Sequence, residues 1–146
     1  MKVHSIGHIV LKVRDLKRSV PFYTEVLGMK EVARNERRMV FMIFEDNHHD
    51  IALIETGLES PDAPKAAPGL AHLALKIGST MEELREAKGW LESHGVKIRR
   101  IRDHAVTKSI YFPDPDGNEI EVFVETDPSV WLKDPELVST GVPMAL

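Results

Sequence analysis

Two strand-like segments of this chain each carry a histidine near their start. Residues 7–13 (GHIVLKV) return as residues 71–77 (AHLALKI), with six successive positions matching in type. A further carboxylate, Glu121, follows the turn-forming residues 114–118 (DPDGN). Two neutral imidazoles and one carboxylate leave open positions on an octahedral metal ion, the facial arrangement of non-haem Fe(II) oxygenases. The residue types therefore predict a metal centre formed by His8, His72 and Glu121.

Strand alternation predicts that these three side chains share one side of a sheet. In each repeated segment the histidine alternates with an aliphatic face that should pack under a helix. In residues 119–124, Ile120, Val122 and Val124 form the aliphatic face, so Glu121 points the other way. The alternative is that both histidines are ordinary strand residues with neighbouring partners. The ligands alone do not select among Fe(II), Mn(II), Co(II) and Zn(II).

The repeat extends beyond these segments and predicts the fold. The first copy comprises a strand, a helix with Asp15 or Ser19 as N-cap and Pro21 in its first turn, and three strands. The second copy has the same order, and its helix begins at the capping box Thr80-x-x-Glu83. We predict an α+β fold: two tandem βαβββ modules that form a cupped, barrel-like mixed sheet with helices outside. The expected strands are residues 3–13, 29–34, 39–45, 50–55, 70–77, 96–101, 107–112 and 119–124.

The domain prediction is a single domain over residues 1–146. Module one covers about residues 3–56, module two about 69–125, and a proline-punctuated C-terminal tail covers 126–146. Aligning residues 50–55 on 119–124 places Ala52 opposite Glu121, so the first module lacks a carboxylate of its own. One complete metal site per chain is therefore expected.

Composition excludes several classes of function. The chain has 146 residues, a formal net charge of −4, 42% hydrophobic and 29% charged residues, and no cysteine. No basic stripe indicates nucleic-acid binding, and no apolar run is long enough to span a membrane. The absence of cysteine excludes disulfides, thiolate metal sites and cysteine nucleophiles. A cytoplasmic location is the expectation.

Three of these segments carry a resemblance to a known family. Residues 7–11 (GHIVL), 69–74 (GLAHLA) and 114–121 (DPDGNEIE) are similar to motifs of the vicinal-oxygen-chelate superfamily, which includes glyoxalases, bleomycin resistance proteins and dioxygenases. The resemblance covers about residues 3–125. It implies paired βαβββ modules with metal ligands on the cupped sheet, but it does not by itself determine the reaction.

Two further segments resemble small single-domain extradiol (catechol 2,3-) dioxygenases. Residues 49–53 (HDIAL) are similar to a segment whose histidine, here His49, acts as acid and base. Residues 103–112 (DHAVTKSIYF) are similar to a segment with a substrate-bonding histidine, here His104, and a tyrosine, here Tyr111, ten positions before Glu121. One departure is Ala105, where glycine is more usual. From the residues alone, His49 can equally be a turn residue, His104 a surface residue and Tyr111 a core aromatic.

The resemblance implies an Fe(II)-dependent extradiol dioxygenase, with Mn(II) as the alternative ion. Its substrates would be a catechol-type diol and O₂, and we expect a homo-oligomer, a dimer or higher. His49, His104 and Tyr111 would be catalytic. Two alternatives stay open: another metal-dependent enzyme of this fold (a glyoxalase-type lyase, an epimerase or a thiol transferase), or a metal-free small-molecule-binding resistance protein. Three converging ionisable groups argue against the metal-free protein.

Overall fold

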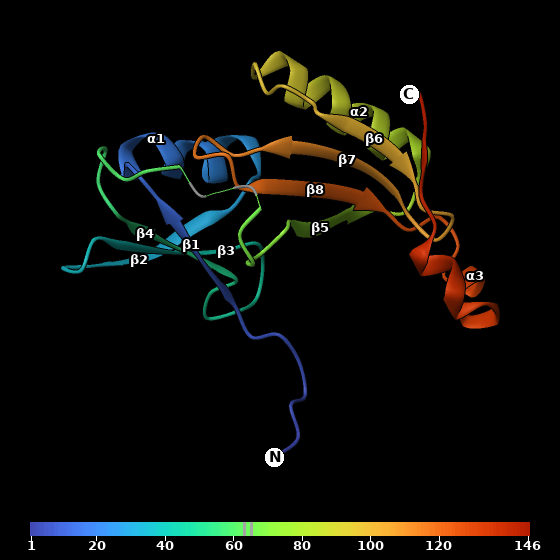
Figure 1. Cartoon of the computed structure of the whole chain (residues 1–146), viewed down its shortest axis with the longest axis horizontal. Coiled ribbons are helices and arrows are strands. Elements are labelled where there is room, and N and C mark those ends of the chain that lie inside the picture. Colours follow the sequence, from blue (N-terminus) through green and yellow to red (C-terminus); the bar gives the residue numbers. More distant parts are fainter. Residues whose placement is uncertain (63, 65) are drawn as a thin grey trace. The chain divides into compact units, whose positions relative to one another are not determined.

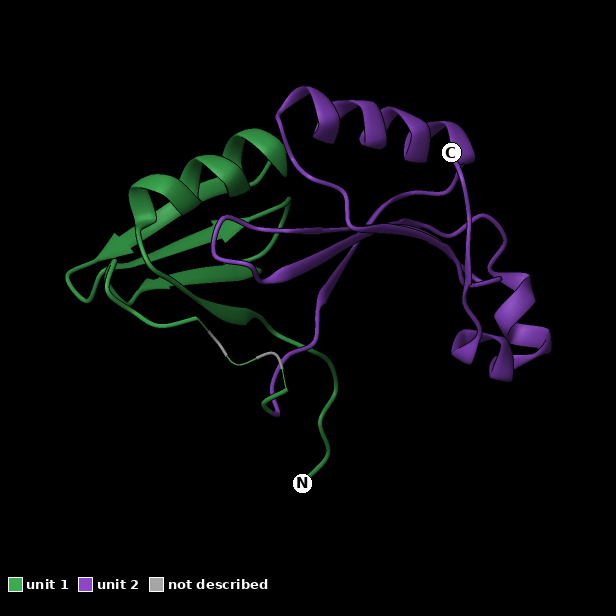
Figure 2. Cartoon of the chain, turned by 45° about the horizontal axis from the view of Figure 1, so that its top comes forward, with its two compact units in different colours: residues 1–67 green, residues 68–146 purple. Residues whose placement is uncertain are grey.

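The computed structural model describes residues 1–62, 64 and 66–146. The chain divides into two compact units, residues 1–67 and residues 68–146, which Figure 2 colours separately. No helix in the described part of the chain combines the length and apolarity needed to cross a bilayer.

Unit 1 contains the first predicted module. Its elements are β1 (Ile9–Val13), α1 (Leu16–Pro21), the π-helical turn η1 (Phe22–Val26), β2 (Lys30–Asn35), β3 (Met39–Ile43) and β4 (Ile51–Glu55). The strands form a four-stranded sheet in the order β1-β4-β3-β2, in which only the β1–β4 pair is parallel (Figure 1). The predicted βαβββ order of the first module is therefore confirmed.

Local sequence explains these elements. In β1 the side chains of Leu11 and Val13 are buried whereas Val10 and Lys12 are exposed, as the alternation predicts. The carboxylate of Asp15 accepts a hydrogen bond from the Lys17 N–H at 2.8 Å, so Asp15, not Ser19, is the N-cap of α1. Pro21 consequently ends α1, and is not in its first turn.

Unit 2 repeats the same order and then adds a strand. It contains β5 (Leu73–Gly78), α2 (Met81–Ser93), β6 (Arg100–Asp103), β7 (Lys108–Pro113), β8 (Glu119–Val124), α3 (Ser129–Lys133), the 3₁₀ helix η2 (Pro135–Ser139) and β9 (Val142–Pro143). The sheet order is β5-β8-β7-β6-β9, with β5 and β8 parallel (Figure 1). The C-terminal tail therefore contributes a fifth strand, which the sequence pattern did not indicate.

Helix α2 covers one face of the five-stranded sheet. It contacts β5, β7 and β8, and it buries Leu84 and Leu91 (Figure 2). The sheet contributes the other core residues on this side: Ile110, Phe112, Ile120, Val122 and Val124. The opposite face of the same strands is therefore the one available for polar side chains.

One expectation about the strands needs correction. Strands β1 and β5 begin at Ile9 and Leu73, so His8 and His72 lie immediately before their strands and not within them. The reason is register: the first β1–β4 pair is Ile9 with Ile51, and the first β5–β8 pair is Leu73 with Ile120. The predicted α+β fold of two βαβββ modules is confirmed: the described residues form a mixed four-stranded sheet and a mixed five-stranded sheet, and neither is a closed barrel. The single-domain assignment stays a prediction.

Candidate active site

Strand register in unit 2 aligns four positions across the sheet. Ala74 of β5 pairs with Glu121 of β8, Glu121 pairs with Tyr111 of β7, and Tyr111 pairs with Arg100 of β6. Paired residues in adjacent strands project to the same face, so this row lies on the face opposite Ile110, Ile120 and the helix. Glu121 and Tyr111 are only 6% and 4% exposed. A buried carboxylate and a buried phenol thus stand side by side.

The carboxylate of Glu121 has an imidazole partner. Nε2 of His72 lies 2.9 Å from Oε2 of Glu121, and the His72 side chain remains 38% exposed. Two ligand atoms each about 2.1 Å from one metal ion, at right angles, stand about 3 Å apart. The separation of these two atoms therefore fits adjacent positions on a single divalent ion, and the donor types suit iron, manganese or zinc.

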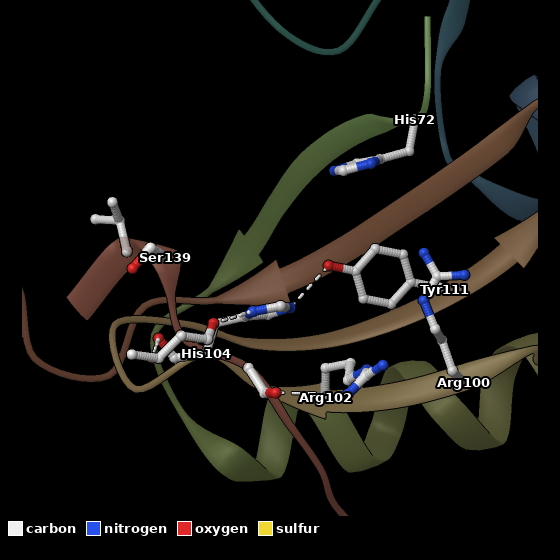
Figure 3. Close-up of a pocket in the computed structure, with 9 residues that line it drawn as sticks. His72, Arg100, Arg102, His104, Tyr111 and Ser139 are labelled. Atoms are coloured by element: carbon white, nitrogen blue, oxygen red, sulfur yellow. Dashed lines mark hydrogen bonds between the residues drawn. The ribbon is translucent and has the colours of Figure 1, made fainter. Parts of the chain in front are cut away.

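His104 and Tyr111 form a second pair on this face. Nε2 of His104 lies 2.9 Å from the Tyr111 hydroxyl, and Nδ1 of His104 lies 2.7 Å from the Thr140 carbonyl oxygen (Figure 3). A carbonyl oxygen only accepts hydrogen bonds, so Nδ1 carries the proton. In the neutral imidazole Nε2 is then the acceptor, and the Tyr111 hydroxyl donates to it. The tail residue Thr140 thereby fixes the tautomer of His104.

The environment of Tyr111 keeps its hydroxyl protonated. Burial, followed by the negative charge of Glu121, raises the pKa of Tyr111 to about 12, although the guanidinium of Arg100 opposes this shift. That guanidinium lies 4.0 Å from the centre of the Tyr111 ring. The phenol is therefore a hydrogen-bond donor at neutral pH and not an anion.

The sequence did not predict that the tail residues Thr140 and Gly141 contact His104. The Thr140 hydroxyl donates to the His104 carbonyl oxygen at 3.2 Å, and a Cβ at Gly141 would lie only 2.7 Å from Nδ1 of His104. Position 141 therefore has no space for a side chain beside the imidazole. No sequence motif in the tail indicates these contacts. They depend on the pairing of β9 with β6, and these two strands lie far apart in the sequence.

In unit 1, His8 and His49 lie together. Their ring centroids are 4.2 Å apart, and Nδ1 of His49 is 2.6 Å from Nδ1 of His48. The carboxylate of Asp50 accepts hydrogen bonds from the Phe44 N–H and the Asn47 side chain, which fixes the bend before β4. Desolvation, together with the charges of His8 and His48, lowers the pKa of His49, whereas Asp50 opposes this effect.

The two copies differ at the position of the carboxylate. Val10 of β1 pairs with Ala52 of β4, and Ala74 of β5 pairs with Glu121 of β8, so Ala52 and Glu121 are equivalent. Within neither unit do the described residues bring three His, Asp or Glu side chains into a metal-holding cluster. Unit 2 contributes two of the predicted ligands, and the participation of His8 stays a prediction.

Comparison with known proteins identifies the family. The family model for the glyoxalase/bleomycin resistance protein/dioxygenase superfamily matches residues 5–122. The chain belongs to this superfamily. A domain of this superfamily from Frankia sp. EAN1pec has the same fold: its structure superimposes with a TM-score of 0.71 at 22% identity, covering 87% of this chain and 96% of that one.

Relatives in the superfamily have several activities. The chain is 32% identical over 139 residues to a catechol-2,3-dioxygenase of Bacillus subtilis, covering 90% of this chain and 45% of that protein. It is 33% identical over 121 residues to a biphenyl-2,3-diol 1,2-dioxygenase of Rhodococcus globerulus, covering 82% of this chain and 63% of that protein. Other relatives are named metallothiol transferases and a lactoylglutathione lyase. The chain thus spans between about half and two thirds of the length of these two dioxygenases.

Proposed function

We propose that this chain carries the site of an Fe(II)-dependent extradiol dioxygenase that acts on a catechol-type aromatic diol. The observation that supports this proposal is the position of Tyr111, which contacts both His72 and His104. Its ring lies edge-on to His72, with centroids 5.6 Å apart, and its hydroxyl bonds to His104. A potential metal ligand, a phenol donor and an imidazole acceptor therefore occupy one face of one sheet. The names of the dioxygenase relatives support the same reaction.

Under this proposal His8, His72 and Glu121 would hold the metal ion. Bound Fe(II), or Mn(II) in its place, would supply the redox chemistry with O₂ that Zn(II) does not offer. Glu121 would bind the ion through its carboxylate, and His72 would bind it through the Nε2 atom that now lies 2.9 Å from that carboxylate. The bound ion would also hold the two vicinal oxygens of a planar diol and so fix the position of the substrate.

The remaining residues would handle protons. His49 would accept a proton from the diol, because imidazole titrates near neutrality. A substrate hydroxyl that donates to Nε2 of His104 would replace the Tyr111 hydroxyl there. The phenolic hydrogen would then be free to bond the substrate oxygen on which negative charge develops. The His104–Tyr111 hydrogen bond would thus be exchanged for two bonds to substrate.

The competing interpretation is that the protein has the same fold but catalyses a different reaction. A thiol transferase or a glyoxalase-type lyase would use the same type of metal ligands, and relatives with these names exist. Such an enzyme would have no need for the His104–Tyr111 pair. Substrate turnover separates these two readings.

The deciding experiment measures oxygen uptake and visible absorbance with Fe(II)-loaded protein and a panel of substituted catechols. We expect oxygen consumption and a yellow ring-opened semialdehyde with at least one catechol, and none with Zn(II)-loaded protein. Tyr111→Phe should retain metal but lose roughly 10²–10³-fold in kcat. His94→Ala, a surface change at the end of α2, should have no effect. Turnover of an epoxide with a thiol, or of a methylglyoxal–thiol adduct, without oxygen uptake on any catechol would overturn the proposal.

A further inference from the structure

A pocket of about 400 Å³ lies within unit 2 and includes part of the proposed reaction site, since His72, His104 and Tyr111 line it. Its walls include Tyr111, His104 and Arg102, and tail residues 138–141 form another wall (Figure 3). Small-molecule sites span roughly 300–1,000 Å³, so this volume suits a single aromatic ring with a short substituent. If a diol binds at His104 and Tyr111, the part of the pocket lined by Arg102 and the tail is the part that a ring substituent would contact.

The two arginines of this pocket differ in their partners. Arg100 donates to both carboxylate oxygens of Glu119, at 3.0 and 2.5 Å, and stacks on the Tyr111 ring. Arg102 has one contact in the described part of the chain, a 3.5 Å approach of Nη1 to the Gly141 carbonyl oxygen. No carboxylate there forms an ion pair with it. The Arg102 guanidinium is exposed at this contact, so an anion that enters the pocket can reach it.

The two hydroxyl groups on the tail side of the pocket already have hydrogen-bond partners. The Ser139 hydroxyl donates to the Glu136 carbonyl oxygen at 2.8 Å. The single hydrogen of the Thr140 hydroxyl is shared between the Leu137 carbonyl oxygen at 2.7 Å and the His104 carbonyl oxygen at 3.2 Å. These hydroxyl hydrogens are already used. Of the two arginines that line the pocket, Arg102 is the one without a carboxylate partner among the described residues, so it is the candidate to bind an anion.

We propose that Arg102 recognises an anionic oxyacid group, a carboxylate, on the ring substituent of the substrate. The planar guanidinium can donate two parallel hydrogen bonds to a carboxylate, a geometry that a neutral group does not reproduce. The diol end of the same molecule lies at His104 and Tyr111. This inference rests on the proposed dioxygenase function and narrows its substrate class to acidic catechols.

The first test is equilibrium binding, which requires neither metal nor turnover. Calorimetry on metal-free protein compares 3,4-dihydroxyphenylacetate with its uncharged amide, which has nearly the same shape. We expect the carboxylate to bind about 10–100-fold more tightly, and added salt to reduce this preference. Arg102→Met should remove the preference, and Arg102→Lys should keep part of it. Arg85→Met, on the exposed face of α2, is the matched control and should preserve it.

The outcomes separate this inference from the proposed function. Equal binding of acid and amide, or a preference that survives Arg102→Met in a variant with an unchanged melting temperature, overturns the inference. Cleavage of uncharged catechols as fast as acidic ones leaves the dioxygenase proposal intact but refutes recognition by Arg102. An Arg102-dependent preference without oxygen uptake upholds the anion site and refutes the dioxygenase. Tighter binding of propylphosphonate than of phenylacetate overturns the choice of carboxylate.

Discussion

At the scale of single residues, Ala105 adopts a backbone conformation that is unfavourable for alanine. Its φ angle is +61°, a left-handed conformation that costs most L-residues about 1–2 kcal/mol. The adjacent Asp103 carboxylate accepts a hydrogen bond from the Ala105 N–H at 2.7 Å, which holds the loop that carries His104. The resemblance led us to expect glycine at this position, and the positive φ gives the physical reason.

We therefore predict that Ala105→Gly stabilises the protein. Relief of the strain exceeds the extra flexibility of glycine in the unfolded chain, about 0.4–1 kcal/mol, so a net gain of about 0.5–1 kcal/mol is expected. Urea unfolding measures this free energy. Ala87→Gly is the matched control: it lies in α2, where glycine should instead destabilise by about 1 kcal/mol. A loss of stability at position 105 would show that the strain is absent.

At the scale of elements, α2 depends on its capping box. The Thr80 side chain accepts a hydrogen bond from the Glu83 N–H at 3.2 Å, and Oε2 of Glu83 accepts from the Ser79 and Thr80 N–H groups, each at 2.8 Å. The Thr80 hydroxyl and these two N–H groups lower the pKa of Glu83. The first turn of α2 is thus tied to an ionised carboxylate.

This linkage predicts a pH-dependent effect of Glu83→Gln. A carboxyl whose pKa is lowered by folding stabilises the fold above its unfolded pKa, about 4.3, and loses this contribution as pH falls through the folded value. The variant should melt at a lower temperature than wild type at pH 7, and the difference should shrink below about pH 4. Glu82→Gln, one residue earlier and without capping contacts, should show a smaller difference. A difference that does not change with pH would contradict the assignment.

At the scale of the whole molecule, duplication supplies two histidines but only one carboxylate. Ala52 occupies in β4 the position that Glu121 occupies in β8. Each chain should therefore bind one divalent ion.

Metal analysis after dialysis tests this stoichiometry. His72→Ala should lower metal affinity by at least about 100-fold, because it removes a ligand while the aliphatic core stays intact. His94→Ala should retain wild-type metal content, since His94 contacts only the end of α2. Two ions per chain, or full metal content in His72→Ala, would exclude the proposed ligand set.

The sequence alone determined the features that depend on local interactions: strand faces, helix caps and the order of elements. Alternation predicted the buried side chains of residues 9–13 and the aliphatic face of residues 119–124, and the capping box placed the start of α2. The repeat predicted the order of elements in both copies, because each copy carries the same pattern of apolar residues and breakers. These features depend on neighbours within a few positions of the chain.

Only the tertiary structure decided which polar groups meet. Pairing of β9 with β6 brings Thr140 and Gly141 to His104, which fixes the protonated nitrogen of that imidazole. The sheet register gives Arg100 a carboxylate partner and leaves Arg102 without one among the described residues. Arg100 and Arg102 look alike in the sequence, since they are two positions apart in one strand and therefore lie on the same face. They differ because their partners come from distant segments, and only long-range strand pairing brings those segments to them.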